Sequence, residues 1–339
     1  MKKLTKVDRI RHSKLIDVPR RWSALMLLTA AATISACQTS MPEQRNQLAN
    51  GAQLAGASCG AFGGDISSPA NATEPNSGRQ FHLEYPCDLG PSEPVVLVLN
   101  LHGAGSYEQW QRLYFPITDY AQDYRMVVAT PTALTAEPIR VWREEADDQY
   151  LQDVSSLLID AIGESNVRSF WLTGHSQGGL TSDRIVCSDY FSDKVDGFVS
   201  LAGGRVGGRH ELQGCDFSHI HTTGELDTAG VAGIPDTSPL ADRYSCGPQT
   251  RLADIVDTQP GKVYDSRTEE NGRPTRPGWG GMPGPGVAEV LVFPNCEDNR
   301  VVADIVRLDK GHTEGLEPQV TRYIARMMAS IPGGKLRGQ

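Results

Sequence analysis

The sequence predicts an α/β fold, in which a mostly parallel central sheet is covered by helices on both faces. Apolar runs of strand length alternate along the chain with segments of helical spacing. This alternation is typical of parallel strands joined by helices. Several runs are apolar at nearly every position, as strands buried on both faces are. A Gly-rich turn at residues 174–178 also joins one such strand to a helix.

The amino terminus has the parts of a bacterial lipoprotein signal peptide. Residues 2–21 carry eight Lys and Arg residues, residues 24–36 are mainly apolar, and the sequence I-S-A-C ends at Cys37. The apolar segment is too short to span a membrane as a stable helix. We expect residues 1–36 to be removed during export and Cys37 to be lipidated, which would anchor the protein to the periplasmic or cell-surface side of a bacterial membrane. The alternative is a cytosolic protein with an apolar amino-terminal helix.

Residues 37–78 have the composition of a flexible tether. They are rich in Gly, Ala, Ser, Asn, Gln and Pro, and few of them could build a core. We expect one folded domain over residues 79–333 and a short tail over residues 334–339. The sequence shows no internal repeat that would divide this domain.

Strands and helices alternate within the expected domain. The run P-V-V-L-V-L-N-L at residues 94–101 is a near-continuous apolar strand, whereas apolar residues three and four apart predict a helix over residues 150–162. Residues 229–286 are expected to be mostly irregular. Strands are expected over residues 79–85, 94–101, 125–130, 169–173, 197–202, 217–223, 287–293 and 301–308, and helices over residues 107–122, 150–162, 180–187 and 318–331.

The turn G-H-S-Q-G, residues 174–178, places Ser176 between a strand and a helix. G-x-S-x-G in that context is a nucleophile elbow, which holds the serine Oγ above the sheet. The glycines let the strand and the helix pass close to each other. The same letters also occur in ordinary Gly-rich loops, so the interpretation depends on the flanking strand and helix.

A serine nucleophile needs a base, and the base needs a carboxylate that orients it. Ser176, Asp227 and His312 occur in the chain order that α/β-hydrolases use for this purpose. Asp227 and His312 each follow an expected strand, and the carboxyl ends of parallel strands meet at one edge of a sheet. We therefore expect a catalytic triad, which needs no metal or organic cofactor. Glu225 is the alternative carboxylate, and both Asp227 and His312 could instead be ordinary loop residues.

Two backbone N–H groups are expected to form an oxyanion hole. Gln177 begins the helix after the serine, and N–H groups at a helix start stabilise a developing negative charge. The second donor should come from the loop after the strand at residues 94–101. That loop reads H-G-A-G, residues 102–105, and we expect the N–H of Ala104 to be the donor.

Trp142 and Trp279 are candidates for lining a substrate cleft, although aromatic side chains more often pack in cores. Trp279 lies in the run P-G-W-G-G-M-P-G-P-G, residues 277–286, whose glycines and prolines disfavour helix and strand. We expect this loop to overhang the catalytic edge, with its base held by a Cys246–Cys296 bridge. The alternative is a surface loop that contacts nothing in the site.

His219 and His221 form H-x-H on an expected strand and could in principle bind a metal. The sequence shows no carboxylate or cysteine at zinc-site spacing beside them, and it contains no C-x-x-C. We therefore expect no metal site.

The charge balance excludes nucleic acid as a partner. The formal net charge of the full chain is −9. Residues 1–36 hold 8 of the 32 basic and 2 of the 41 acidic residues, so the chain without them has 24 basic against 39 acidic residues, a charge of −15. A strongly acidic surface repels phosphate backbones.

Six cysteines remain besides Cys37, an even number that suits disulfides in an oxidising compartment. The sequence alone does not fix their pairing. Proximity along the chain favours Cys59–Cys87, Cys187–Cys215 and Cys246–Cys296.

Four motifs together resemble those of the polyhydroxybutyrate depolymerase and feruloyl esterase group of α/β-hydrolases. They are L-V-L-N-L-H-G-A-G, G-H-S-Q-G-G, G-E-L-D and K-G-H-T-E-G. The resemblance covers Arg79 to Ile331 and implies that residues 79–333 form an α/β-hydrolase catalytic domain. Cys187 and Cys215 also resemble that group's disulfide positions. The acid loop departs from the group's usual G-T-A-D, and Glu314 stands where the group has an aromatic residue.

These observations predict an exported, lipid-anchored serine hydrolase that cleaves carboxylic esters through an acyl-enzyme. The resemblance implies polyhydroxyalkanoate-, feruloyl- or acetyl-ester-like substrates, either small or polymeric. A serine peptidase on the same fold is one alternative, because a triad does not distinguish amides from esters. A non-catalytic surface binding protein that kept the fold is another.

Overall fold

A computed structural model describes residues 57, 59–60, 68–134, 138–227, 234–264 and 278–338. All of these residues belong to one compact unit, Gln44–Gln339. The expected signal peptide and Cys37 lie outside the described residues. Within the described ranges, no helix is both long enough and apolar enough to cross a membrane.

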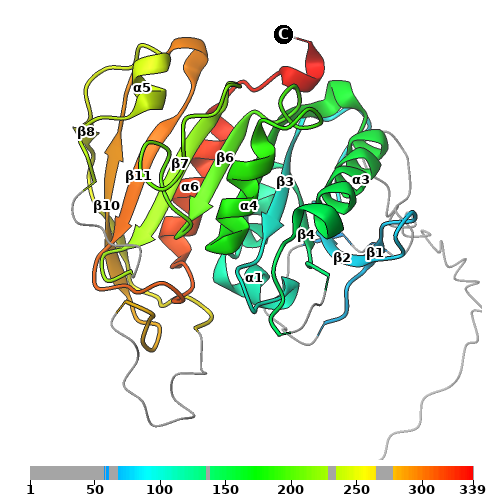
Figure 1. Ribbon diagram of the computed structural model, residues 1–339, viewed down its shortest axis with the longest axis horizontal. Coiled ribbons are helices and arrows are strands. Elements are labelled where there is room, and N and C mark those ends of the chain that lie inside the picture. Colours follow the sequence, from blue (N-terminus) through cyan, green and yellow to red (C-terminus); the bar gives the residue numbers. More distant parts are fainter. Residues whose placement is uncertain are drawn as a thin grey trace, which may run out of the picture. The chain divides into compact units, whose positions relative to one another are not determined.

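The described strands form one mixed sheet in the order β1-β2-β4-β3-β5-β6-β7-β11-β10-β8, with β9 paired to β10 (Figure 1). The central strands from β4 to β11 run parallel, whereas β1, β2, β8, β9 and β10 are antiparallel to their neighbours. The strands are β1 Ala72–Thr73, β2 Gln80–Glu84, β3 Val95–Leu101, β4 Met126–Pro131, β5 Val167–His175, β6 Gly197–Leu201, β7 Ser218–Gly224, β8 Thr250–Arg251, β9 Ile255–Asp257, β10 Gly286–Val292 and β11 Val302–Arg307.

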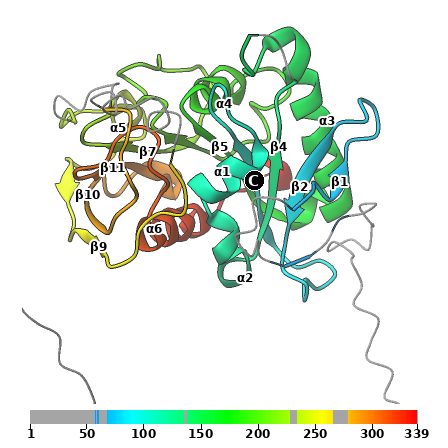
Figure 2. The ribbon, with the colours of Figure 1, turned by 90° about the horizontal axis from the view of Figure 1, so that it is seen from below.

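Helices cover both faces of this sheet, as Figure 2 shows from below. The helices α3 and α4 lie on one face, and α1, α2 and α6 lie on the other. Together with the strand order, this arrangement is the α/β-hydrolase fold, which confirms the predicted fold class. The helices are α1 Glu108–Tyr114, α2 Ala121–Tyr124, α3 Glu144–Ile162, α4 Gln177–Val186, α5 Pro239–Arg243 and α6 Pro318–Ser330.

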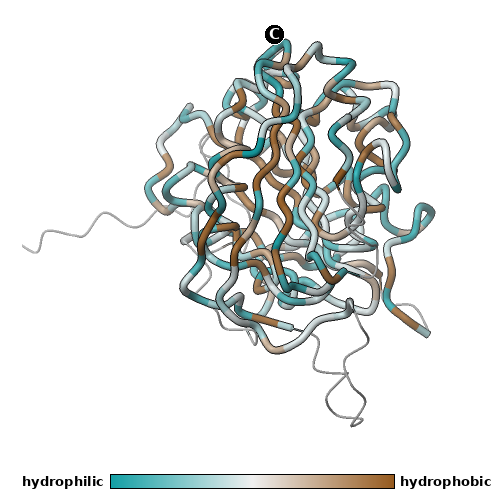
Figure 3. Tube along the Cα trace, turned by 90° about the vertical axis from the view of Figure 1, so that its left-hand side faces the viewer, coloured by the Kyte–Doolittle hydropathy of each residue, from teal (hydrophilic) through white to brown (hydrophobic). Residues whose placement is uncertain are grey.

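Two apolar cores, one on each face, explain the near-continuous apolar strands. In β3, Val95, Leu97 and Leu99 pack into the core under α3 and α4, whereas Val96 and Val98 pack into the core under α6. Alternate residues of a strand point to opposite faces, so a strand covered on both faces is apolar throughout. Figure 3 shows hydrophobic residues in brown along the central strands.

Three elements differ from the sequence-based expectation. The helix expected over residues 107–122 is interrupted at Pro116: α1 ends at Tyr114, and a 3-10 turn, Ile117–Tyr120, leads into α2. A proline lacks the N–H that a helix interior requires. The helix α3 begins at Glu144, before the expected start. Residues 229–286 contain α5, β8 and β9 within their described part.

The expected boundary between tether and domain at residue 78 is wrong. Ala72 in β1 pairs with Phe81 in β2. The side chain of Asn71 exchanges two hydrogen bonds of 2.8 and 2.9 Å with the backbone of Leu83. The segment is ordered by pairing with β2, and its own polar composition does not reveal this. The folded domain therefore begins before Arg79.

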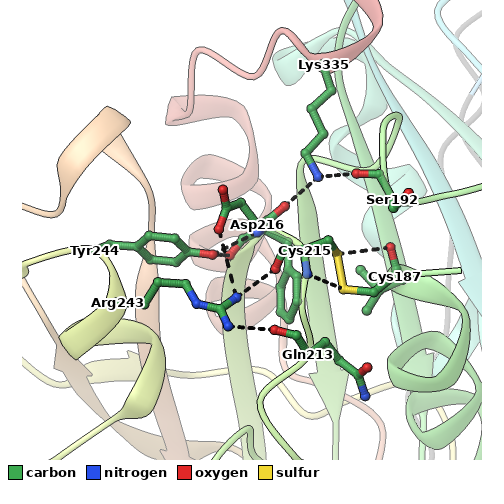
Figure 4. Close-up of a disulfide and its surroundings, with 10 residues drawn as sticks. Cys187, Ser192, Gln213, Cys215, Asp216, Arg243, Tyr244 and Lys335 are labelled. Carbon is green, nitrogen blue, oxygen red and sulfur yellow. Dashed lines mark hydrogen bonds and ion pairs between the residues drawn. A yellow bond between two sulfur atoms is a disulfide. The ribbon is translucent and has the colours of Figure 1, made fainter. Parts of the chain in front are cut away.

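The structure contains all three disulfides that proximity favours, Cys59–Cys87, Cys187–Cys215 and Cys246–Cys296. Cys187 follows α4, and Cys215 precedes β7. Figure 4 shows Arg243 beside this bridge, where its guanidinium donates to the backbone oxygens of Gln213 at 2.6 Å and Cys215 at 2.8 Å. The bridge therefore fixes the helix after Ser176 relative to the segment that leads into β7.

Candidate active site

Ser176 lies at the turn between β5 and α4, as the sequence predicts. Its backbone has φ 51° and ψ −115°, a conformation that costs about 1 to 3 kcal/mol for a residue other than glycine. The crossing is tight, because a Cβ on Gly174 would lie 2.2 Å from the carbonyl carbon of Gly178. His175 and Gly178 are buried, whereas Ser176 is partly exposed. The turn thus presents the hydroxyl at the edge of the sheet.

Hydrogen bonds connect Ser176 to His312 and His312 to Asp227. Nε2 of His312 lies 2.8 Å from Oγ of Ser176. Nδ1 of the same ring lies 3.0 and 2.9 Å from the two carboxylate oxygens of Asp227. A carboxylate can only accept, so Nδ1 carries a proton and the Nε2 lone pair accepts from the serine hydroxyl. The three side chains have the mutual geometry of a nucleophile, its base and an orienting acid.

Glu225, the alternative carboxylate, lies apart from this chain of hydrogen bonds. Its side chain is exposed, and it accepts a hydrogen bond of 2.9 Å from the backbone N–H of Asp309. Asp227 is buried at 4% exposure. Asp227 is therefore the carboxylate of this turn that His312 contacts.

A buried ion pair holds the loop that carries His312. Arg307, at the end of β11, donates to both carboxylate oxygens of Glu317 at 2.8 and 3.1 Å. The same guanidinium donates to the backbone oxygens of Glu314 at 2.9 Å and Gly315 at 2.8 Å. Burial works to raise the pKa of Glu317, but the charge and hydrogen bonds of Arg307, together with a backbone hydrogen bond and the charge of Lys310, hold that pKa below its usual value. The loop is thus fixed to the end of β11.

Glu314 is one position at which the sequence departs from the polyhydroxybutyrate depolymerase and feruloyl esterase group. Its side chain has a structural role. Its side chain is buried, and its carboxylate accepts a hydrogen bond from the backbone N–H of Gly311. It closes the turn around His312.

The loop at residues 102–105 leaves the N–H of Ala104 available beside the serine. The N–H of Gly105 donates to the backbone oxygen of Arg140 at 2.7 Å, and that of Ser106 donates to Gly103 at 3.2 Å. The N–H of Ala104 has no partner among the described residues, and Ala104 lines the same cavity as Ser176. Gln177 is the first residue of α4, where backbone N–H groups lack intrahelical partners.

The expectation that Trp142 lines a substrate cleft is wrong. Trp142 is only 4% exposed, and its indole N–H donates to the backbone oxygen of His102 at 2.8 Å. The side chain of Gln177 exchanges hydrogen bonds of 3.0 and 2.9 Å with the Trp142 backbone. Trp142 therefore supports the loop of Ala104 through His102, and it joins that loop to the start of α4.

Trp279 lines the cavity beside Ser176, as expected. Its ring centroid lies 5.1 Å from that of His312. The backbone oxygen of Trp279 accepts from the N–H of Thr313 at 2.8 Å and from its hydroxyl at 2.6 Å. The described part of the loop therefore lies at the catalytic edge and is joined to the His312 loop.

The Cys246–Cys296 bridge does not hold the base of the Trp279 loop. Cys296 follows the end of β10, whereas the loop precedes its start. The ammonium of Lys310 takes this anchoring role, since it donates to the backbone oxygens of Gly284 at 2.7 Å and Pro285 at 3.3 Å. The anchor thus comes from the His312 loop itself.

Three further aromatic residues line a cavity of about 240 Å³ in front of Ser176: Tyr107, Trp110 and Tyr264. Sequence reasoning missed all three. Tyr107 and Trp110 follow directly after the H-G-A-G loop, and that position could have identified them. Tyr264 comes from the segment after β9, and no local sequence pattern predicts that this segment lies at the site.

A ring nitrogen of His219 and one of His221 lie next to protein oxygen atoms. His219 lies 3.3 Å from the backbone oxygen of Phe198, and burial lowers its pKa to about 3. His221 lies 3.1 Å from a carboxylate oxygen of Asp304, which also binds Arg205 at 2.9 Å. The described part of the chain contains no group of three or more His, Cys, Asp or Glu residues that could hold a metal ion.

No protein-family model and no curated protein matches the sequence. Solved structures of similar fold include an acetyl xylan esterase from Aspergillus awamori, with a TM-score of 0.46 and 10% identity over 78% of this chain and 96% of that one. Est1E from Butyrivibrio proteoclasticus, solved with ferulic acid, has a TM-score of 0.30 and 13% identity over 45% of this chain and 78% of its own.

Esterase 2 from Thermogutta terrifontis, solved in a form phosphorylated by paraoxon, has a TM-score of 0.34 and 15% identity, and the match covers 48% of this chain and 71% of that one. At such scores these similarities add nothing to what the strand order shows.

Proposed function

We propose that this protein is a serine hydrolase that cleaves carboxylic esters through an acyl-enzyme, with Ser176, His312 and Asp227 as its catalytic triad. One observation carries the proposal: a continuous chain of hydrogen bonds runs from Asp227 through His312 to Ser176. The serine lies in a strained turn and lines a cavity. A structural serine needs neither the strain nor the base.

The reaction has two halves. Oγ of Ser176 attacks the ester carbonyl while Nε2 of His312 takes its proton, and Asp227 stabilises the imidazolium. The tetrahedral intermediate collapses, the carbon–oxygen bond to the alcohol breaks, and His312 returns the proton to that alcohol. A water molecule then attacks the acyl-enzyme with the same base, which releases the acid and restores Ser176.

The backbone N–H groups of Ala104 and Gln177 would stabilise the negative oxygen of both intermediates. Ala104 follows β3 and Gln177 begins α4, and each lies next to the serine or lines its cavity. Donors fixed before the reaction stabilise developing charge without reorganisation. Trp142 would keep the first donor in place through its bonds to His102 and Gln177.

The cavity favours an ester with a flat or apolar group next to the carbonyl. Tyr107, Trp110, Tyr264 and Trp279 contribute aromatic surface around it, and flat rings pack well against such groups. Its volume of about 240 Å³ is below that of pockets that enclose drug-sized ligands. A small acetyl ester, one feruloyl group or one unit of a polyhydroxyalkanoate would suit it, with the rest of a polymer outside.

We further propose export and lipid anchoring at Cys37, with the domain on the periplasmic or cell-surface side of a bacterial membrane. The order of basic residues, apolar segment and small residues before Cys37 supports this. The three disulfides suit the oxidising compartment that export implies.

Reaction with an alkyl fluorophosphonate, followed by peptide mapping, tests the proposal. We expect the wild-type protein to gain one phosphonyl group at Ser176 and the Ser176→Ala variant to gain none. Absence of labelling in the folded wild-type protein would instead favour a binding protein. Acetate, feruloyl and hydroxybutyrate esters, each paired with its amide, then separate an esterase from a peptidase: preferred cleavage of the amides would contradict ester specificity.

A further inference from the structure

His175, the residue before Ser176, contacts two other loops of the site. It lies buried at the end of β5, and its two ring nitrogens face different segments. Nε2 lies 2.9 Å from the backbone oxygen of His312. Nδ1 lies beside Gly103, where an added Cβ would come within 2.6 Å of it. One imidazole therefore lies between the serine turn, the His312 loop and the loop of Ala104.

The bond to His312 determines which nitrogen of His175 carries the proton. A backbone oxygen can only accept, so Nε2 is protonated and donates. Burial, and then the charge of His312, hold the pKa of His175 well below its usual value. Nδ1 has no hydrogen-bond partner among the described residues. The ring thus remains neutral when His312, 4.9 Å away between centroids, becomes an imidazolium.

Aromatic rings hold His175 in this orientation. The ring of Tyr114 lies 4.0 Å from that of His175, and the ring of Trp110 lies 5.2 Å away, centroid to centroid. The hydroxyl of Tyr114 donates a second, longer hydrogen bond of 3.3 Å to the backbone oxygen of His312. Two buried side chains thus bind one carbonyl group, and the shorter bond comes from His175.

We propose that His175 is a positioning residue, which sets the geometry between Ser176 and His312 by donating a hydrogen bond to the His312 backbone. The proposal rests on the proposed function, since it assigns a role within the same site. Arg307 and the Trp279 segment hold the His312 loop from other sides. The bond from His175 differs because it comes from the strand that carries the nucleophile.

The expected consequence is kinetic. Nε2 of His312 lies 2.8 Å from the serine oxygen, and a misplacement of about 1 Å in such a pair costs on the order of 10²-fold in rate. Loss of the His175 donor should therefore slow activation of the serine. Since His175 also lines the cavity, ligand binding should change by much less than the rate, and the number of competent sites should stay the same.

Inactivation by an alkyl fluorophosphonate measures this effect without a known substrate. We would compare the maximal inactivation rate, the half-saturating probe concentration and the final labelled fraction. His175→Phe keeps a ring but removes the donor, and His175→Asn has an amide too short to reach the carbonyl. His175→Gln has an amide nitrogen that can take the place of Nε2. His219→Phe is the matched control, since His219 is another buried histidine next to a backbone oxygen, that of Phe198.

We expect the Phe and Asn variants to show a maximal rate lowered by on the order of 10²-fold, with full final labelling and a half-saturating concentration that changes by much less. The Gln variant should recover most of the rate, and His219→Phe should react like the wild type. The proposal is overturned if the Phe or Asn variant reacts at the wild-type rate, or if Gln rescues no better than Asn. If the wild-type protein itself is not labelled at Ser176, the proposed function fails instead.

Discussion

Both carboxylate oxygens of Asp227 lie within hydrogen-bonding distance of one nitrogen of His312, at 2.9 and 3.0 Å from Nδ1. Such a double contact fixes the ring in the tautomer that leaves Nε2 free to accept from Ser176. It also places a negative charge beside the imidazolium that forms in the reaction. The residue is only 4% exposed and its side chain is fully buried, so little water competes for the carboxylate.

Asp227→Asn should retain the fold and lose activity by about 10⁴-fold, because an amide nitrogen facing Nδ1 favours the wrong tautomer of His312. Turnover of a simple acetate ester measures the loss, with the unfolding transition as the check on folding. Glu225→Gln is the matched control, since Glu225 bonds to Asp309 and not to His312. Near-normal turnover of Asp227→Asn would remove Asp227 from the triad.

Trp279→Ala should raise KM for bulky aromatic or polymeric esters by about tenfold, equivalent to about 1.4 kcal/mol of lost contact. Acetate esters should be little affected, because a small acyl group buries little of the indole ring. Met282→Ala, a change at an exposed residue of the same loop, should alter neither. Equal effects of Trp279→Ala on both ester classes, or none on either, would exclude the ring from the substrate site.

His102 should make the fold sensitive to mild acid. Burial lowers its pKa to about 3, and its Nε2 accepts from the N–H of Ala133 at 3.0 Å. Between pH 6.5 and 3 the unfolded chain therefore binds a proton that the folded chain does not. The free energy of unfolding is therefore not reduced by His102 above pH 6.5. Below that pH it falls, by up to about 1.4 kcal/mol per pH unit.

Urea unfolding at pH 7 and pH 5 measures this effect. The His102→Gln variant keeps an acceptor for Ala133 but does not titrate. Its loss of free energy of unfolding between the two pH values should be smaller than that of the wild type by about 2 kcal/mol. An identical loss in both proteins would show that His102 is not the group responsible.

Cys37→Ser should release the protein from the membrane fraction without changing its specific activity, because the lipid would be attached to this thiol. One acyl chain binds a membrane only marginally, so stable anchoring requires the multiply acylated amino terminus of a lipoprotein. Fractionation of cells that express each form measures the release. Retention of the variant in membranes would point to an uncleaved amino-terminal helix.

Local patterns were sufficient to predict the serine turn and the fold class. The turn follows from five adjacent residues, and the two-sided burial of β3 follows from its unbroken apolar run. Asp227 and His312 lie 85 residues apart, and only their order and their positions after strands pointed to a shared site. Proximity along the chain was sufficient for the disulfides because each bridge joins two cysteines that follow one another in the sequence.

Features created by tertiary contacts could not be predicted. Trp142 and Trp279 were both candidates for the cleft, yet the indole N–H of Trp142 donates to the backbone of His102, while Trp279 lines the cavity. Residues 71–73 read as a polar linker because their order comes from pairing with β2. His175 occupies a variable position of G-x-S-x-G, and its importance depends on the His312 backbone, 137 residues away.

The proposed reaction requires Ser176 and His312 to act as one unit, and a double-mutant comparison of ester turnover tests this directly. We would measure kcat/KM for Ser176→Ala, His312→Ala and the double variant on the same ester. Each single change should abolish nearly all turnover, and the double variant should be no worse than either, because removing one member already disables the other. Substantial turnover by Ser176→Ala, or a double variant much slower than both single variants, would show that the two residues do not act as one catalytic unit.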